Sequence, residues 1–244
     1  MLIFSSLSSQ FFFFDVRGMY IKALFFIKNA QFYFIIQGVR MFVFKHPFTC
    51  LISGPTQCGK THFTLKLLAN LNELITPKPE RVIWCRGEQQ TLQLPPNVEV
   101  SDGLNALDTI DGIAPTLIII DDLMQEAGEE KDVVNLFTRG SHHRNLSVIM
   151  LVQNLFHRGK FMRTMSLNTH YLILFKNPRD AGQIRILASQ LFPGKTQYLV
   201  EAYKQATARP HGYLLLDFKQ DTCDALRVLS DVLNGEEGFY YAPK

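Results

Sequence analysis

The chain has 244 residues, of which 47% are hydrophobic and 19% charged, and its formal net charge is +3. This composition predicts a folded chain with a sizeable core and excludes a largely disordered one. The four cysteines show no CxxC spacing. Their scatter argues against a zinc site or a disulfide framework and favours an intracellular, reducing compartment, either nucleus or cytoplasm.

Residues 1–43 differ from the rest of the chain because they are hydrophobic and rich in phenylalanine, with four in succession at Phe11–Phe14. The longest uncharged run in this segment is 14 residues, whereas a membrane-spanning helix needs about 20. We therefore expect no stable membrane insertion and interpret residues 1–43 as an N-terminal extension of doubtful function. Weak membrane association is the alternative.

A phosphate-binding motif follows the first buried strand that the sequence predicts. The strand is the apolar run Thr49–Gly54, and the motif GPTQCGKT, Gly54–Thr61, matches G-x-x-x-x-G-K-[ST]. Apolar residues at helical spacing then predict a helix through Leu74. Strand, glycine loop and helix form the context that this motif requires. The residues expected to surround the phosphates of ATP are Gly54, Pro55, Thr56, Gln57, Cys58, Gly59, Lys60, Thr61 and His62.

Within this loop, two side chains have their own expected roles. Lys60 is expected to reach the β- and γ-phosphates, and the hydroxyl of Thr61 is expected to bind Mg²⁺. The two glycines let the backbone curl so that its N–H groups converge on phosphate, and the following helix adds the positive end of its dipole.

A second apolar strand ends in two acidic residues. The segment TLIIIDDLM, Thr116–Met124, places Asp121 and Asp122 directly after its apolar run. Asp121 is the expected metal residue, which with Thr61 holds Mg²⁺. Asp122 is the expected catalytic residue that orients or deprotonates the attacking water, where many hydrolysing ATPases carry Glu. The alternative for Asp122 is a cap of the following helix.

A third strand, Leu146–Asn154, carries the polar residue Gln153 near its end, after the apolar run Val148–Val152. An amide at the carboxyl end of a strand lies where open α/β sheets bind their ligands. We therefore expect Gln153 to lie beside the γ-phosphate and to act in catalysis.

The remaining strands and helices alternate along the chain. Strands are predicted over 81–85, 170–176 and 212–218, and helices over 131–143 and from Asn177-Pro178 onward, with Ser101 and Asp102 as the cap of a short helix. This alternation predicts an α/β protein with the P-loop NTPase fold, a three-layer sandwich with a mostly parallel central sheet. The expected ATPase core is 44–220, and 221–244 form a C-terminal tail with a short helix.

One long window of the chain is basic. No Asp or Glu occurs from Val133 through Arg179, whereas Lys and Arg occur there repeatedly, together with four histidines. This distribution is typical of a surface that binds a polyanion or a nucleotide phosphate. The alternative is that two buried strands within the window exclude charge of either sign.

Five blocks together resemble one family. They are GPTQCGKT, IIIDDLM, LFTRGSHHRNLSVIMLVQNLF, SLNTHYLILFKNPRDAGQIRILASQLFP and EAYKQATARPHGYLLLDF. The chain from about Phe44 to Phe218 is similar to the genome-packaging ATPases of double-stranded DNA viruses and of Polinton (Maverick) transposons. More distantly it resembles the FtsK/HerA class of DNA pumps. The resemblance implies a ring of identical subunits, a hexamer, that hydrolyses ATP to move double-stranded DNA into a capsid.

The resemblance also implies functional residues and partners. Lys60, Thr61, Asp121 and Gln153 fall on motif positions of the family, and Asp122 on its usual Glu position. The family uses an arginine finger from a neighbouring subunit, and the matching spacing lands on His142 here. Arg144 is the first candidate for the finger, Arg139 the second and Arg179 the third. Implied partners are sequence-independent double-stranded DNA and capsid proteins, with a virion-associated location if the chain is viral.

The first hypothesis is a DNA-translocating ATPase, in which loops containing Arg158, Lys160 and Arg163 bind the DNA backbone. The second is a transposon-derived module that binds nucleotide without motor activity. The third is a nucleotide kinase, which shares the phosphate loop but does not require the Asp121-Asp122 pair. DNA-stimulated ATP hydrolysis discriminates the first hypothesis from the other two.

Overall fold

The structure of the chain is a computed structural model. It describes residues 10–16, 19–28, 31–37, 42–87, 92–121, 123, 133–140, 145–155, 160–179, 181–233 and 238–242. For 10–37, and for residues 139, 140, 160–163 and 181, only the backbone is described.

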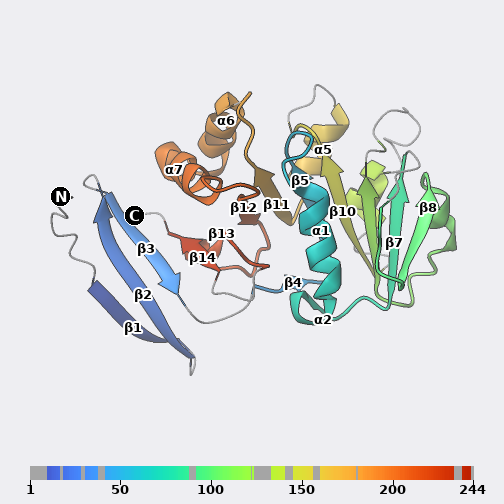
Figure 1. The fold of residues 1–244 in the computed structure, drawn as a ribbon, viewed down its shortest axis with the longest axis horizontal. Helices are drawn as coiled ribbons and strands as arrows, with labels where there is room; N and C mark the ends of the chain where they lie inside the picture. The colour runs from blue at the N-terminus through green and yellow to red at the C-terminus, as the bar shows by residue number, and fades with distance from the viewer. Residues whose placement is uncertain are drawn as a thin grey trace.

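The described residues form a mixed α/β fold around one large sheet of 12 strands (Figure 1). Six neighbouring strands are parallel, and they run in the order β11-β5-β10-β9-β7-β8 across the sheet. Their bounds are β5 (Thr49–Ser53), β7 (Arg81–Arg86), β8 (Val98–Asp102), β9 (Thr116–Asp121), β10 (Leu146–Val152) and β11 (Tyr171–Phe175). These six strands confirm the prediction of a large central sheet that is mostly parallel.

Antiparallel strands extend the sheet beyond β11. They are β12 (Tyr213–Asp217), β13 (Val228–Ser230), β14 (Phe239–Tyr241), β3 (Gln31–Gln37), β2 (Met19–Lys28) and β1 (Gln10–Val16), in that spatial order. The backbone of the N-terminal segment therefore pairs with the C-terminal strand β14. A separate two-stranded sheet joins β4 (Phe44–Lys45) to β6 (Ile75–Thr76).

Helices and helical turns connect these strands. They are α1 (Lys60–Ala69), α2 (Leu71–Leu74), η1 (Asn105–Thr109), the π-helical turn η2 (Leu136–Gly140), α5 (Lys160–Leu167), α6 (Ala181–Leu191), α7 (Thr196–Ala206) and η3 (Asp224–Leu226). Among the helices of the described residues, none combines the length and the apolar character required to cross a bilayer.

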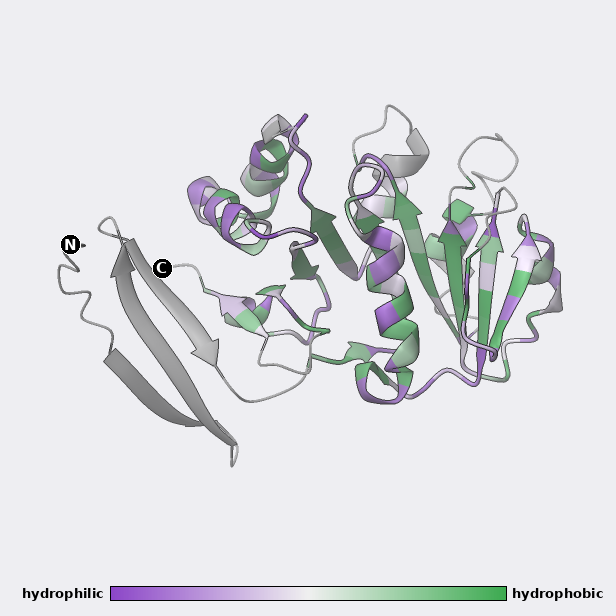
Figure 2. Cartoon of the chain, in the orientation of Figure 1, coloured by the Kyte–Doolittle hydropathy of each residue, from purple (hydrophilic) through white to green (hydrophobic). Residues whose placement is uncertain are grey.

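Except for the edge strand β8, the parallel strands are buried on both faces, and each face has its own apolar cluster. Neighbouring residues of β5 belong to different clusters, with Leu51 in one and Ile52 in the other, because side chains alternate along a strand. The cluster of Ile52 contains α1 and α2, whereas the cluster of Leu51 contains residues of η2, α5, α6 and α7. Figure 2 shows the resulting hydrophobic strands at the centre of the sheet.

Two sequence predictions differ from the structure at their boundaries. Ser101 and Asp102 end the edge strand β8 and do not cap η1, which begins at Asn105 after a turn. The helix expected from Asn177 begins at Ala181, because the Asn177 side chain first forms a local turn in which its Oδ1 accepts the Arg179 N–H at 3.1 Å.

A buried polar network fixes the start of β5 against β10. Ser147 Oγ accepts the N–H of Phe48 at 3.1 Å and lies 2.6 Å from Nδ1 of His46. His46 Nε2 lies 2.9 Å from Oδ1 of Asn145. Because that oxygen only accepts, Nε2 carries the proton. In the neutral ring, which burial favours, Nδ1 then accepts from the Ser147 hydroxyl. Burial is the main cause that lowers the pKa of His46.

This network predicts a pH-dependent stability. The pKa of His46 is lower in the folded chain than in the unfolded one, where it is about 6.5, so below that pH the unfolded chain binds more protons. The free energy of unfolding should therefore fall as pH decreases from 7 to 5, by up to about 1.4 kcal/mol per pH unit. Urea unfolding at several pH values across this range gives the free energy of unfolding at each pH. This free energy should change less with pH in His46→Gln than in wild type, whereas the control His62→Gln, at an exposed position, should show the wild-type dependence on pH. The same dependence on pH in His46→Gln and wild type would contradict the buried network.

Candidate functional site

The loop between β5 and α1 emerges at the carboxyl edge of the parallel strands. β5 is wholly buried and ends at Ser53, and the N–H of Gly54 then donates to the carbonyl of Val152 in β10 at 3.2 Å. The chain turns through residues 55–59 and enters α1 at Lys60. The strand, loop and helix predicted from the motif are therefore present in that order.

Both glycines of the loop are required by the structure, for different reasons. A Cβ on Gly54 would lie 2.6 Å from Sγ of Cys58 and 2.7 Å from Cβ of Phe175, which leaves no room for a side chain. Gly59 has φ of 115°, a conformation that side chains rarely adopt. Gln57 also has a positive φ, 64°. These left-handed residues curl the loop into the kind of concave backbone that binds anions.

The amides at the start of α1 face this concave loop. The first intrahelical bond runs from the N–H of Phe63 to the carbonyl of Gly59 at 2.9 Å. Helix geometry therefore leaves the N–H groups of Lys60, Thr61 and His62 without an acceptor inside the helix. Such amides, together with the positive end of the helix dipole, attract anions.

The ammonium group of Lys60 lies over the same loop. Its Nζ donates to the carbonyl of Gly54 at 2.6 Å and to that of Pro55 at 3.1 Å. The side chain thus places a positive charge inside the loop rather than in open solvent. A phosphate that entered here would exchange carbonyl contacts of Lys60 for stronger contacts with an anion.

Asp121 reaches the same edge of the sheet from β9. It pairs in register with Leu151 of β10, which in turn pairs with Ile52 of β5. One strand therefore separates β9 from β5, which corresponds to about 10 Å between their backbones. Lys60 and Asp121 lie at one edge of the molecule and not at opposite edges. Asp122, the expected catalytic acid, lies outside the described residues.

Gln153 lies between these two groups. It directly follows Val152, whose register partner in β5 is Ser53, so it lies level with Gly54. Its side chain is exposed at the edge of the sheet. Three segments that are distant in sequence thus bring Lys60, Asp121 and Gln153 to one edge.

The arginine candidates stay predictions. Arg144 lies outside the described residues, and for Arg139, in η2, only the backbone is described. Arg179 is exposed after β11. Of the residues expected to contact DNA, Arg158 lies outside the described residues, and the side chains of Lys160 and Arg163 in α5 are likewise not described.

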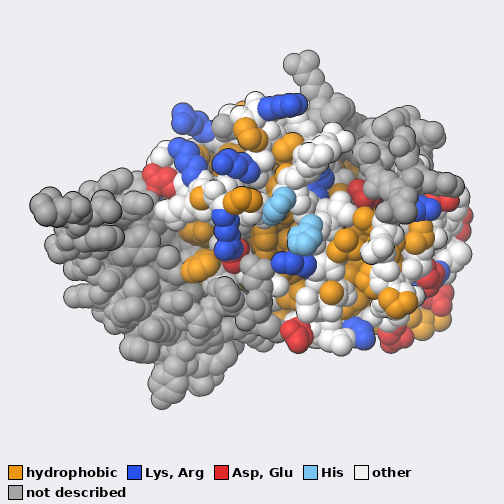
Figure 3. All heavy atoms as spheres, viewed as in Figure 1, with side chains coloured by type: hydrophobic (Ala, Val, Ile, Leu, Met, Phe, Trp, Pro, Cys, Tyr) orange, Lys and Arg blue, Asp and Glu red, His pale blue; other side chains and the backbone are white. Residues whose placement is uncertain are grey.

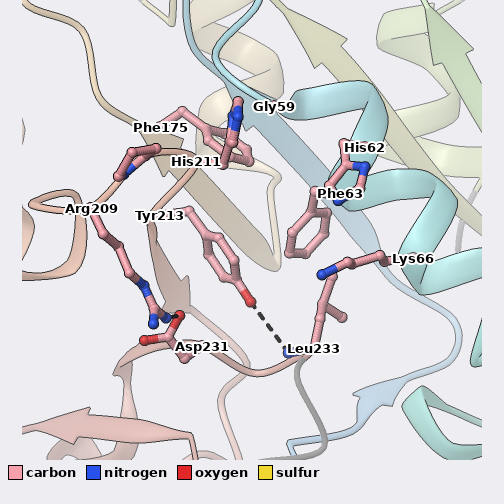
Figure 4. Close-up of a pocket in the computed structure, with 11 residues that line it drawn as sticks. Gly59, His62, Phe63, Lys66, Phe175, Arg209, His211, Tyr213, Asp231 and Leu233 are labelled. Atoms are coloured by element: carbon pink, nitrogen blue, oxygen red, sulfur yellow. Dashed lines mark hydrogen bonds and ion pairs between the residues drawn. The ribbon is translucent and has the colours of Figure 1, made fainter.

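Sequence reasoning missed a further wall of the site, the strap Ala208–Gly212 that precedes β12. Its His211 accompanies the loop residues Pro55–Cys58 in a pocket of about 390 Å³, which Lys176 and Pro178 also line. A second pocket, of about 300 Å³, lies on the other side of His211, against α1. In Figure 4 Gly59, Phe175 and His211 gather at one end of that second pocket. The one local sequence feature of this segment is Pro210-His211-Gly212, which is typical of a turn.

Positive charge predominates around these two pockets. Lys66, Lys176 and Arg209 line them, and among their lining residues Asp231 is the one acid. Asp231 forms an ion pair with Arg209, which compensates its charge locally. Figure 3 shows Lys and Arg side chains on the same face of the molecule as histidine side chains. The edge that carries the loop is therefore suited to an anionic ligand.

Cys58 is the one cysteine in the loop, and it is partly buried. Burial raises the pKa of its thiol, and the nearby Lys60 only partly offsets this effect. Its sulfur packs beside Gly54 as a small apolar group, which is the usual role of an unreactive cysteine. Within the described ranges, no group of three or more His, Cys, Asp or Glu side chains lies close enough together to hold a metal.

No family model and no curated protein sequence matches the chain. Among solved structures, the X-ray structure of the ATPase DotB from Legionella pneumophila is similar to it with a TM-score of 0.36 and 9% sequence identity. The alignment covers 83% of this chain and 69% of the DotB chain. A likeness at this level assigns neither a fold family nor an activity.

The packing of Gly54 predicts that a single methyl group disturbs the loop. Gly54→Ala should lower the free energy of unfolding by about 1–3 kcal/mol, because the new Cβ meets Phe175 and Cys58. Gly238→Ala is the matched control, since its Cβ would meet its nearest neighbour at 3.4 Å, and its effect should stay within about 0.5 kcal/mol. The double variant Gly54→Ala/Cys58→Ala should recover part of the lost free energy of unfolding, as measured by urea unfolding. A Gly54→Ala chain as stable as wild type would contradict the close packing of loop and β11.

Proposed function

We propose that this chain binds ATP with Mg²⁺ at the carboxyl edge of its parallel strands and hydrolyses it. The observation that carries the proposal is that the loop Gly54–Lys60 and the carboxylate of Asp121 share one edge, with β10 between them. The amides of the loop and the ammonium of Lys60 suit phosphate. The carboxylate of Asp121 lies one strand away, which leaves space for a metal ion between it and the phosphate. Helical residues in both apolar clusters support the three-layer P-loop NTPase fold as part of this proposal.

The residues present fit a magnesium ion that is held jointly with phosphate. Mg²⁺ usually keeps several waters and takes one or two carboxylates together with phosphate oxygens, rather than a complete protein cage. The hydroxyl of Thr61, in the first turn of α1, and the carboxylate of Asp121 would hold it. When bound, the ion would neutralise negative charge on the β- and γ-phosphates.

The remaining catalytic roles are proposed from sequence and position. Gln153, exposed between the loop and Asp121, is proposed to face the γ-phosphate. Asp122 is proposed to orient the attacking water. Arg144 or Arg139, supplied by a neighbouring subunit, is proposed to neutralise charge in the transition state, a contribution worth about 10³–10⁵ in rate in related enzymes.

The pocket beside the loop is the proposed position of the nucleoside. Its volume of about 390 Å³ falls within the range of ligand pockets, about 300–1,000 Å³. Loop residues Pro55–Cys58 form one wall, so a ligand whose phosphates lie on the loop would extend into it. Lys176 and the strap form the facing wall.

The particular ATPase proposed is a DNA-translocating motor of the genome-packaging type. This step rests on the resemblance of the sequence blocks and on the window from Val133 through Arg179 that lacks Asp and Glu. The proposed assembly is a hexameric ring that contacts double-stranded DNA through phosphate-binding loops and works with capsid proteins. The alternative is a nucleotide-binding module without motor activity, which the intact set of Lys60, Thr61 and Asp121 disfavours.

The nucleotide site is tested by Lys60→Ala. Removing the ammonium that lies over the loop should lower the ATP hydrolysis rate about 100-fold or more. The matched control is Lys204→Ala, an exposed lysine of α7 outside both pockets, which should hydrolyse ATP at the wild-type rate. Steady-state phosphate release measures the outcome, and equal rates for Lys60→Ala and wild type would remove the enzyme assignment.

The motor function is tested by the response to double-stranded DNA. Contacts with the DNA backbone release counterions, so affinity should fall steeply between 50 and 200 mM salt, about 10³-fold if six phosphates are contacted. DNA should stimulate ATP hydrolysis, and replacing Arg158, Lys160 and Arg163 together by Ala should reduce both the stimulation and the salt dependence. Binding of ATP without turnover, or DNA affinity that is independent of salt, would favour the module without motor activity.

A further inference from the structure

The imidazole of His211 contacts the phosphate-binding loop directly. Its Nδ1 lies 3.1 Å from the carbonyl oxygen of Cys58, which can only accept, so Nδ1 carries a proton and donates to that oxygen. The same ring covers Gly59, where an added Cβ would lie 3.0 Å from Nδ1. This contact joins residues that are 153 positions apart in the sequence.

The hydrogen bond fixes the direction of one loop amide. The peptide between Cys58 and Gly59 is planar and trans, so its carbonyl and its N–H point in opposite directions. Because the carbonyl of Cys58 points toward His211, the N–H of Gly59 points away from the strap. The strap and this N–H therefore lie on opposite sides of the Cys58–Gly59 peptide.

Without this bond, the peptide would be free to rotate. Gly59 has no Cβ and can adopt both signs of φ, so the backbone itself does not impose one orientation. A rotated peptide would present the carbonyl oxygen of Cys58, a partial negative charge, to a bound phosphate. The contact with His211 therefore selects the orientation that suits an anion.

The strap is built to hold His211 in place. His211 itself has φ of 59°, a left-handed conformation that persists only when the surroundings determine it. Gly212 closes the turn with an N–H bond to the carbonyl of Arg209 at 3.1 Å, and a Cβ there would lie 2.3 Å from the carbonyl of Ala206. The side chain of Arg209 is paired with Asp231.

Aromatic packing anchors the end of the strap to the site. The ring of Tyr213 packs against Phe63 of α1 with centroids 4.8 Å apart, and against Phe175 of β11 at 5.7 Å. Its hydroxyl accepts the N–H of Leu233 at 3.3 Å, the bond drawn as a dashed line in Figure 4. The residue after the strap is thus fixed to the helix and to the strand that border the loop.

We propose that His211 is a positioning residue for the phosphates, which acts by holding the Gly59 amide toward the ligand through the carbonyl of Cys58. The proposal deepens the proposed nucleotide site and rests on it. It assigns a role to a residue that lies outside the sequence motif and that does not itself touch the phosphate. The ligand class is a di- or triphosphate, because the oriented amide serves the phosphate chain and not the nucleoside.

The experiment compares His211→Ala with His211→Asn in the full chain. Asn tolerates left-handed backbone and keeps a donor on a short side chain, so it should retain most of the affinity. Isothermal titration with ATP and, separately, with inorganic triphosphate should show about three- to tenfold weaker binding for His211→Ala, the effect of one hydrogen bond. Inorganic triphosphate, which lacks the nucleoside, should lose affinity by the same factor as ATP. Gln205→Ala, an exposed position on the helix before the strap, is the matched control.

Each outcome tests either the positioning role of His211 or the proposed nucleotide site. Equal triphosphate affinity for His211→Ala and wild type, with Lys60→Ala abolishing binding, would overturn the role of His211 and leave the proposed nucleotide site standing. Weaker binding of ATP with unchanged binding of inorganic triphosphate would also overturn it, because His211 would then act through the nucleoside pocket that it lines. A wild-type chain that binds neither ATP nor inorganic triphosphate would overturn the nucleotide site itself. Thermal unfolding of each variant separates loss of fold from loss of binding.

Discussion

The pairing of β10 with β5 on one side and β9 on the other is the constraint on which the candidate site depends. Both ladders are parallel, so the three strands end at one edge and deliver their last residues there. Register then decides which residues meet. Ile52, Leu151 and Asp121 are level, and a shift of one residue would turn the Asp121 side chain to the other face of the sheet. Hydrogen bonds at the opposite end hold that register: the Phe48 N–H donates to Ser147 Oγ, and the Ser147 hydroxyl donates to His46 Nδ1.

The parts of the site that follow from local sequence could be predicted. The loop could be predicted from its glycines, since Gly54 lacks room for a side chain and Gly59 adopts a left-handed conformation. The buried strands could also be predicted, because wholly apolar runs such as Leu117–Ile120 have no polar face and must lie inside a sheet. The common edge of Lys60, Asp121 and Gln153 then follows from parallel topology.

The parts that depend on contacts between distant segments could not be predicted. His211 meets Cys58 only because β12 packs beside β11, and nothing near residue 211 signals a phosphate loop. The strand Val98–Asp102 was missed because it lies at the sheet edge, where its side chains are largely exposed and its apolar pattern is weak. The same weakness led to the interpretation of Ser101 and Asp102 as a helix cap. Pairing of residues 31–37 with β14 likewise depends on two ends of the chain meeting.

The antiparallel direction of β12 has a consequence for how the chain matures on the ribosome. Phe175 at the end of β11 pairs with Tyr213 at the start of β12, so the reversal brings the preceding strap back beside a motif made about 150 residues earlier. A nascent chain therefore completes the motif well before it contains the strap that forms one wall beside the motif. A chain interrupted between the two segments would carry the motif without the strap residue that contacts it.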